Sequence, residues 1–437
     1  MKNSVTLLIE NRILFISLTI LLLCGCGKDE NMMDVSSCNT PNILLIIADD
    51  IGKDALNGFS EGSIKPITPH IDSIRTSGLS FTNFWSYPTC SPTRASILTG
   101  KYGYRTGVKW ASDVLDLSET SLQEYINQGS NNAYSTAIIG KWHLSGNSST
   151  FNPEVFGIDH YSGLIRGQAQ SYYNWLLTED GAGSLQSDYA TEKFTNLALE
   201  WIGEQDDNWF MWLAYNAPHT PFHAPPVEMH SQGDLPTFAN GMDEIPYYLA
   251  AIEAMDFQIG RLLDGIPEAE KENMVIIFIA DNGTPNEVAQ LPYSGNTAKG
   301  TLHQGGINVP MFISGRDVTR IENDHSLVTS TDLFATISEI AGVPTSEIHD
   351  SKSIKSLFTQ SGTIRNYQYA EKDDGNVNNW AISDGTYKLI EYVDGNTEFY
   401  DLENDPYEQN ALLDNELNAL ESVAKQDLQA ELLNIRQ

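Results

Sequence analysis

The sequence predicts an α/β fold: a large, doubly wound, mixed but mostly parallel sheet flanked by helices, followed by a small antiparallel sheet and a helix. Two observations carry this prediction. Up to about residue 362, strand-length apolar runs alternate with helical patterns, which is the order typical of parallel α/β sheets. After that residue, short alternating strands are separated by Asp-Gly turns, which favours antiparallel hairpins.

Two continuous apolar runs, Asn42–Ala48 and Met274–Ala280, have the length and composition of strands that are buried on both faces. The first run ends at Asp49-Asp50 and the second at Asp281-Asn282. These four residues offer only oxygen ligands, which suits a hard divalent cation, and calcium more than magnesium because calcium tolerates a looser geometry. A helix cap or a solvated turn is the alternative for either acidic pair taken alone.

Two further strand-length runs end in basic residues. Ala133–Ile139 leads into Lys141 and His143, and Trp209–Tyr215 leads into His219. In open α/β sheets, ligands bind beyond the carboxyl ends of the strands. We therefore expect the acidic and basic clusters to meet at one edge of the sheet, although each base alone could be a solvated or core residue.

The remaining elements follow from local patterns. Helical periodicity and end signals predict helices over Thr68–Ser77, Ser121–Gln128, Asp188–Gly203, Pro246–Leu263 and Thr331–Ala341. Further strands are predicted over Val309–Ile313, Trp380–Ser383, Thr386–Tyr392 and Thr397–Leu402. A last helix follows, with Leu417, Leu420, Ala424 and Leu428 on its apolar face.

The N-terminus reads as a targeting segment. Lys2 and Arg12 precede an apolar run that is short for a membrane span, and the sequence up to Cys26 resembles a bacterial lipobox with Cys26 as the lipidated residue. Gly27–Glu30 resembles the surface-export signal of Bacteroidetes lipoproteins. We expect a lipid-anchored protein at the outer membrane or cell surface, with a periplasm-facing location as the alternative.

These boundaries divide the chain into four parts: a signal peptide over 1–25, a lipidated tether over 26–40, a main α/β domain over 41–362 and a C-terminal α+β subdomain over 363–437. The 58 acidic residues against 25 Lys and Arg give a net charge of −33, which argues against nucleic acid as a partner. An anionic ligand would need a local cluster of cations.

Cys90 stands in Cys-Ser-Pro-Thr-Arg, where Pro92 suits the first turn of a helix. A helix start favours anions, and Arg94 lies one turn further on. Because Cys24 leaves with the signal, Cys26 is acylated and Cys38 lies in the tether, we expect Cys90 to be the one cysteine of the folded body. A buried structural cysteine and a Cys38–Cys90 disulfide are the alternatives.

This pentapeptide, followed by Leu-Thr-Gly, resembles the signature of the formylglycine-dependent (type I) sulfatases of the alkaline phosphatase-like superfamily. Other segments match that family in order and similar spacing: Asp49-Asp50 with Gly52 and Asp54, Gly-Lys-Trp-His at 140–143, Ala-Pro-His at 217–219, Asp281-Asn282-Gly283, Lys299-Gly300, Gly305-Gly306 and the tail at 399–406. Ser145, His303 and Asn308 depart from the usual family residues, and this bears on substrate contacts more than on chemistry.

The resemblance implies that a sulfatase-maturating enzyme oxidises Cys90 to formylglycine (3-oxoalanine), whose hydrate is the nucleophile. It implies that one cation is bound by Asp49, Asp50, Asp281, Asn282 and the modified Cys90. Arg94 would hold the hydrate, and Lys141, His219 and Lys299 would hold the sulfate. His219 or Lys299 would protonate the leaving alcohol, and His143 would take a proton from the second hydroxyl.

We therefore predict a sulfatase whose partner is a sulfated oligo- or polysaccharide, such as the algal glycan ulvan or a glycosaminoglycan. Arg166 is the predicted sugar contact, in an insertion with the aromatic residues Tyr161, Tyr172, Tyr173 and Trp175, for which burial in the core is the alternative. A formylglycine-dependent phosphodiester or phosphonate hydrolase and a non-catalytic glycan-binding lipoprotein are the other hypotheses.

Overall fold

The structure is a computed structural model that describes residues 40–437. The predicted signal peptide, the lipidated Cys26 and the tether up to residue 39 lie outside the described residues, so these assignments stay predictions. Within residues 40–437 no helix has the length and apolar character needed to cross a membrane.

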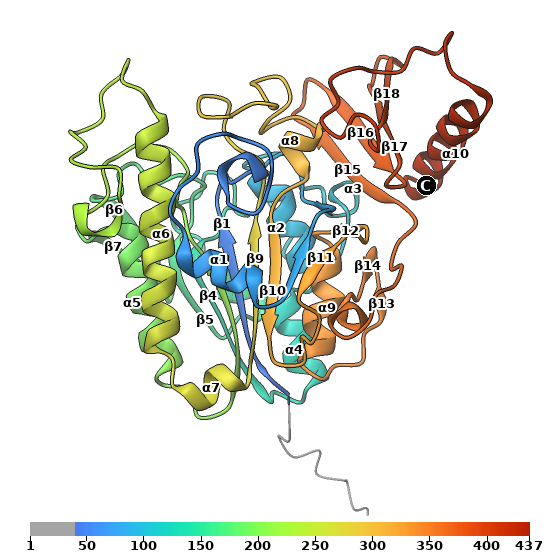
Figure 1. The fold of residues 1–437 in the computed structure, drawn as a ribbon. Helices are drawn as coiled ribbons and strands as arrows, with labels where there is room; N and C mark the ends of the chain where they lie inside the picture. The colour runs from blue at the N-terminus through green and yellow to red at the C-terminus, as the bar shows by residue number, and fades with distance from the viewer. Residues whose placement is uncertain (1–39) are drawn as a thin grey trace, which may run out of the picture. The chain divides into compact units, whose positions relative to one another are not determined.

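A ten-stranded mixed sheet forms the centre of the fold (Figure 1), in the order β11-β2-β10-β9-β1-β8-β4-β5-β6-β7. The four expected apolar strands are its neighbouring, parallel middle members: β9 (Met274–Ala280), β1 (Asn42–Ala48), β8 (Asn208–Ala214) and β4 (Tyr134–Lys141). The others are β2 (Leu79–Phe81), β5 (His160–Leu164), β6 (Trp175–Glu179), β7 (Ala182–Gln186), β10 (Met311–Gly315) and β11 (Glu322–Asp324). The predicted fold class is confirmed, and β10, antiparallel to β9, makes the sheet mixed.

The register of the middle strands sets where the polar clusters lie. Ala48 of β1 is level with Ala280 of β9, and Ala214 of β8 is level with Gly140 of β4. Each strand therefore ends at the same edge of the sheet, and the residues that follow it are delivered there. All seven residues of β1 are buried, as the continuous apolar run predicts.

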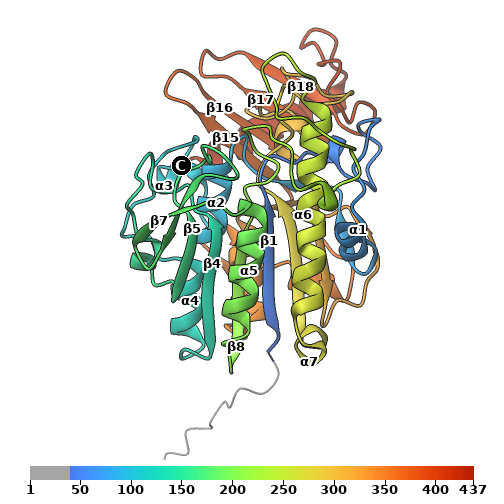
Figure 2. The same cartoon turned by 90° about the vertical axis from the view of Figure 1, so that its left-hand side faces the viewer.

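Helices cover both faces of the sheet. The five predicted helices are confirmed as α1 (Pro69–Thr76), α4 (Leu122–Gly129), α5 (Ala190–Ile202), α6 (Ile245–Gly265) and α9 (Asp332–Ile340). Figure 2 shows α5 and α6 across one face, while α2 (Cys90–Thr99), α4 and α9 pack together on the other side. The shorter elements are α3 (Gly103–Thr106), α7 (Glu268–Glu272), α8 (Gln304–Ile307), β3 (Phe84–Trp85), β12 (Val328–Thr329), β13 (Glu347–Ile348) and β14 (Ser351–Lys352).

A four-stranded antiparallel sheet and helix α10 (Ala419–Ile435) end the chain. Its strands are β15 (Gln368–Asp373), β16 (Asn378–Ser383), β17 (Tyr387–Glu391) and β18 (Thr397–Asp401). The predicted apolar face of α10 is wrong at Leu420, which is 78% exposed. The reason is that the capping box of Asn418 and Glu421 places Leu420 in the first turn, whereas the sheet packs against Leu428 and Leu432 further along.

The C-terminal sheet packs on the segment that follows Lys299. Ala370, Ala381 and Ile390 of the sheet form one buried cluster with Leu302 and Ile307. Beside this cluster, Lys388 of β17 and Glu408 form a fully buried ion pair of 2.5 Å, and Glu408 accepts a hydrogen bond from the backbone N–H of Gln304. The described residues group as one compact unit, so the division at residue 362 stays a prediction.

Candidate active site

Cys90 is the first residue of α2, where the Pro92 pattern predicts a helix start. Its side chain is buried, and its Sγ lies 3.0 Å from Nδ1 of His143. Burial raises the pKa of the thiol, and the nearby Lys141 only partly offsets this effect. The thiol therefore stays protonated at neutral pH, which makes it a poor nucleophile in its unmodified form. Cys90 is the only free cysteine of the described residues, and Cys38 lies outside them.

The four predicted oxygen ligands come together in front of α2. Ligand atoms of Asp49, Cys90 and Asp281 lie within 4.8 Å of one another, as do those of Asp49, Asp50 and His219. Oδ1 of Asp49 and Oδ1 of Asn282 are buried and have no hydrogen-bond donor. A buried oxygen without a partner costs about 1–3 kcal/mol, so these two atoms fit a bound cation. The donor set suits a hard divalent ion.

Three cationic side chains pair with the three carboxylates. Lys141 Nζ lies 2.6 Å from Asp49 Oδ2, and Lys299 Nζ lies 2.5 Å from Asp50 Oδ1. Arg94 donates to Asp281 Oδ2 from Nη2 at 2.7 Å and from Nε at 3.1 Å, and its Nη1 donates to the Lys141 carbonyl. When all three carboxylates are ionised, as they would be as ligands of a cation, the charges of the three pairs cancel, and a divalent cation would leave the cluster with two positive charges. Such a site attracts a sulfate group even in a strongly acidic protein.

The pKa values of Asp49 and Asp50 are shifted in opposite directions. Burial raises the pKa of Asp49 well above its usual range, since Lys141 offsets the lost hydration only in part. Burial would raise the pKa of Asp50 as well, but Lys299 and His219 outweigh it and lower this pKa. Asp50 has a positive φ of 75°, and the Tyr248 hydroxyl donates to its carbonyl at 2.7 Å. Asp50 is thus held as an anion in a fixed position.

His143 follows β4 with a φ of 58°, and Nδ1 of its ring faces Cys90 Sγ. Its backbone N–H donates to Ile165 O at 3.1 Å, and its carbonyl accepts from Ser91 Oγ at 2.8 Å. Its Nε2 lies 3.3 Å from Ser112 Oγ. Burial and the neighbouring Lys141 lower the pKa of His143 well below its usual value. The ring is therefore neutral at pH 7 and is able to accept a proton.

His219 lies in the loop after β8, on the more open side of the cluster. Its Nε2 is 3.7 Å from Asp50 Oδ2, and its Nδ1 is 2.8 Å from Thr220 O. The Tyr172 hydroxyl donates to the carbonyls of Asn216 and His219 and so holds this loop. Burial lowers the pKa of His219 to about 4, against the opposing effect of Asp50. His219 and Lys299 are also the partly exposed members of the cluster, so an anionic ligand can reach them.

The profile of the sulfatase family matches residues 41–343. This chain belongs to the sulfatase family. The profile of the C-terminal region of N-sulphoglucosamine sulphohydrolase matches residues 295–437. The resemblance drawn from the cysteine signature is thereby confirmed, and with it the class of sulfuric ester hydrolases.

Related proteins have low sequence identity to this chain, but the matches cover most of its length. The uncharacterized sulfatase YdeN of Escherichia coli is 26% identical, over 72% of this chain and 65% of its own length. Arylsulfatase G of Rattus norvegicus is 28% identical, over 74% of this chain and 70% of its own. The chain thus spans about two thirds of the length of these two sulfatases.

Solved structures share the fold. A structure of Ps i-CgsB in complex with k-i-k-neocarrahexaose has a TM-score of 0.75 at 23% identity, over 90% of this chain and 92% of its own. A structure of BT4656 in complex with its substrate D-glucosamine-2-N, 6-O-disulfate has a TM-score of 0.76 at 20% identity, over 91% of this chain and 98% of its own. At these identities the likeness establishes the fold of the sulfatase chain.

Three of the four aromatic residues of the predicted insertion follow the alternative, burial in the core. Tyr161 of β5, Trp175 of β6 and Tyr172 in the segment between these strands are buried in the core. Tyr173 is 39% exposed, and its hydroxyl donates to Ala224 O. Arg166 is exposed beside the site, and its role as a substrate contact stays a prediction.

Two residues of the site carry no signal in the sequence. Gly167 faces the His143 ring so closely that a Cβ atom there would lie 2.1 Å from His143 Cε1. Ser112 contacts the same ring from another loop. Neither residue belongs to a motif. Two of the three residues that depart from the usual family residues have structural partners: His303 contacts Glu398, and Asn308 accepts a hydrogen bond from Lys53.

Proposed function

We propose that this sulfatase hydrolyses sulfate esters of a sulfated carbohydrate, using a formylglycine made from Cys90 and one divalent cation, calcium. One observation carries the proposal. Cys90 lies within 4.8 Å of the carboxylates of Asp49 and Asp281 and 3.0 Å from a neutral histidine. A precursor of the nucleophile, an oxygen-rich ligand set and a base therefore share one buried cluster.

The cation would be held by Asp49, Asp50, Asp281, Asn282 and the modified residue 90. When bound, it lowers the pKa of a hydroxyl group, and the hydrated aldehyde supplies that hydroxyl as the nucleophile. Lys141, Lys299 and His219 would bind the sulfate oxygens, and the two fixed ammonium groups would stabilise the negative charge that develops there. Arg94, fixed by Asp281 and the Lys141 carbonyl, would hold the hydrate of residue 90.

Proton transfer is assigned to the two histidines and Lys299. His143 Nδ1 faces residue 90 and is neutral, so it would take the proton of the second hydroxyl there. The Lys299 ammonium would protonate the departing alcohol on the open side, or His219 Nε2 would do so in the imidazolium form that a bound sulfate and Asp50 favour. Because a serine at position 90 carries only one hydroxyl, it could not be regenerated in this way.

The carbohydrate substrate is supported by what related proteins bind. Two structures with this fold contain a carrageenan hexasaccharide and a disulfated glucosamine, and a human relative, 29% identical over 69% of this chain, is N-acetylgalactosamine-6-sulfatase. Anchoring at the outer membrane through Cys26 rests on the lipobox and the following charged residues alone. Sulfate release from algal oligosaccharides and from glycosaminoglycan oligosaccharides decides which of the two is the substrate.

The test combines maturation and turnover. The protein is produced with a sulfatase-maturating enzyme, and mass spectrometry of the peptide containing residue 90 is expected to show conversion of cysteine to formylglycine. Sulfated oligosaccharides and an aryl sulfate should lose sulfate, Cys90→Ala should be inactive, and Cys38→Ala is the matched control. Full activity of Cys90→Ala, or faster turnover of a phosphodiester than of any sulfate ester, would refute the proposal.

A further inference from the structure

A cavity of about 300 Å³ lies between the segment Leu164–Gln170 and the hairpin of β6 and β7. This volume is at the lower end of the range found for ligand pockets. Its lining includes one cation, several neutral amides and two leucines: Arg166, Gln168, Gln170, Asn174, Leu176 and Leu185. None of these residues has a role in the reaction derived above.

The wall of this cavity is continuous with the active site. Ile165 O accepts the backbone N–H of His143, and Gly167 packs against the ring of the same histidine. One residue further on, Gln168 donates to Thr220 Oγ1 at 3.1 Å, next to His219. The segment 165–168 therefore bridges the two histidines of the site. Arg166 lies between these contacts and lines the cavity.

The polar groups of the cavity are available to a ligand. Within residues 40–437, Arg166 forms no ion pair, and the side-chain amides of Gln170 and Asn174 form no hydrogen bond with the protein. Leu185 is 73% exposed and Leu176 is 38% exposed. Free amides suit sugar hydroxyls, exposed leucines suit the C–H face of a sugar ring, and a guanidinium binds a carboxylate or sulfate in bidentate fashion.

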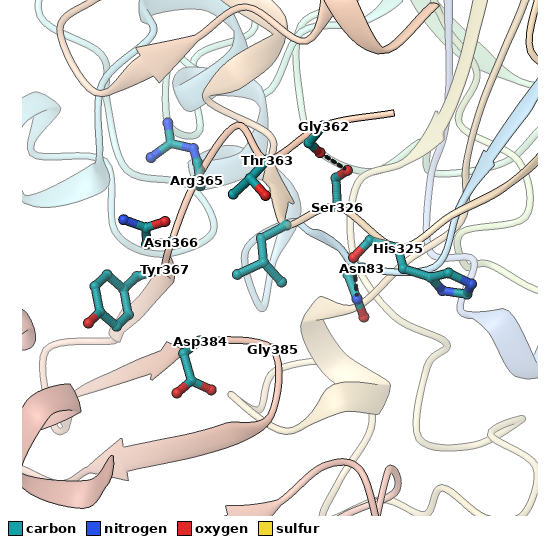
Figure 3. Close-up of a pocket in the computed structure, with 11 residues that line it drawn as sticks. Asn83, His325, Ser326, Gly362, Thr363, Arg365, Asn366, Tyr367, Asp384 and Gly385 are labelled. Atoms are coloured by element: carbon teal, nitrogen blue, oxygen red, sulfur yellow. Dashed lines mark hydrogen bonds between the residues drawn. The ribbon is translucent and has the colours of Figure 1, made fainter. Parts of the chain in front are cut away.

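A larger cavity lacks these properties. It has a volume of about 590 Å³ and lies between the segment around Asn83 and His325 and the C-terminal sheet (Figure 3). Asn83 donates to His325 O, Ser326 donates to Gly362 O, and Arg365 pairs with Asp332. Its polar side chains are thus largely satisfied by the protein, and it shares no lining residue with the predicted active site.

We infer that the smaller cavity is the subsite for the sugar next to the sulfated one, and that Arg166 selects an anionic group on that neighbouring sugar. The inference rests on the proposed sulfatase activity and names its substrate class. A carboxylate of a uronic acid and a second sulfate share the chemistry that Arg166 recognises. In a chain of net charge −33, this unpaired cation beside the site would attract such a group while the surrounding surface repels it.

The inference is tested with Arg166→Gln and with Arg261→Gln as the matched control, since Arg261 is a partly exposed arginine on α6. The substrates share one sulfated sugar whose neighbour is neutral, carboxylated or sulfated, and an aryl sulfate has no neighbour. In Arg166→Gln, the ratio of kcat/KM for an anionic over a neutral neighbour is expected to fall about ten- to a hundredfold. The ratio should be unchanged in Arg261→Gln.

Binding provides a second readout that needs no turnover. Calorimetric Kd values of the same oligosaccharides are measured in the Cys90→Ala background with and without Arg166→Gln, and the same loss of discrimination is expected. A ratio that changes less than about twofold, or an equal loss for all substrates including the aryl sulfate, would overturn the inference. Absence of sulfate release by the matured wild-type protein would instead overturn the proposed function. The kcat/KM values for the substrates with a carboxylated and with a sulfated neighbouring sugar show which anion Arg166 prefers.

Discussion

Replacing Gly167 by alanine should disable His143 without unfolding the protein. A Cβ atom at position 167 would lie 2.1 Å from Cε1, 2.2 Å from Nε2 and 2.5 Å from Nδ1 of the His143 ring. Because non-bonded carbon atoms approach to about 3.5–4.0 Å, the ring or the segment must move by roughly 1 Å or more. His143 Nδ1 is now 3.0 Å from the Cys90 side chain. A displacement of about 1 Å costs on the order of 10²-fold in rate, within the ~10²–10⁴ contributed by a general base.

The assay is kcat for an aryl sulfate, with the formylglycine content of each preparation measured by mass spectrometry so that maturation and catalysis are separated. Gly362→Ala is the matched control, because a Cβ there would meet only Leu357 Cδ2, at 4.0 Å. We expect Gly167→Ala to lose about 10²-fold in kcat at equal formylglycine content, and Gly362→Ala to match the wild type. Wild-type kcat in Gly167→Ala would refute the assigned role of the His143 position.

Three further predictions concern stability. Calcium at a hundredfold excess over its Kd should stabilise the protein by about 2.7 kcal/mol, seen as a rise in Tm that a chelator reverses; an unchanged Tm would contradict the cation site. Burial raises the pKa of Glu371 to about 7, so the folded state holds this proton more tightly than the unfolded chain does, and the free energy of unfolding should fall as pH rises from about 4.5 to 7. In thermal scans Glu371→Gln should make this fall shallower, and an unchanged dependence of Tm on pH would contradict the prediction. Glu408→Gln leaves the Lys388 ammonium buried and unpaired, which should lower the free energy of unfolding in urea by about 3–5 kcal/mol. Glu416 is exposed, so Glu416→Gln should change this free energy little, and an equal effect of both variants would contradict the role of the ion pair.

The sequence predicted the middle strands of the sheet well, because a strand that is buried on both faces needs apolar residues at nearly every position. The run Asn42–Ala48 is apolar at nearly every position, since β1 is covered on both faces, and its bounds match the predicted ones. The segment Gln368–Asp373 has no such apolar run. It mixes polar and charged residues, and it becomes β15 only because β16 supplies its hydrogen bonds and Glu371 is buried beside Tyr104. Tyr161 and Tyr172 show the opposite case: their residue type suits a sugar-binding surface as well as a core, and only the folded structure shows that both rings are buried.

The sequence alone indicated which residues are candidates for the chemistry and that they follow strand ends, because motif spacing and apolar periodicity are local properties of the chain. It did not determine which cation pairs with which carboxylate. Lys141 meets Asp49 and Arg94 meets Asp281 because parallel pairing places β4, β8, β1 and β9 side by side, in an order unrelated to their order in the chain. The close approach of Gly167 to His143 and the cavity beside it also depend on how β5 and its following loop lie against β4. These contacts join residues that are distant in sequence, and only the register and packing of the folded sheet decide them.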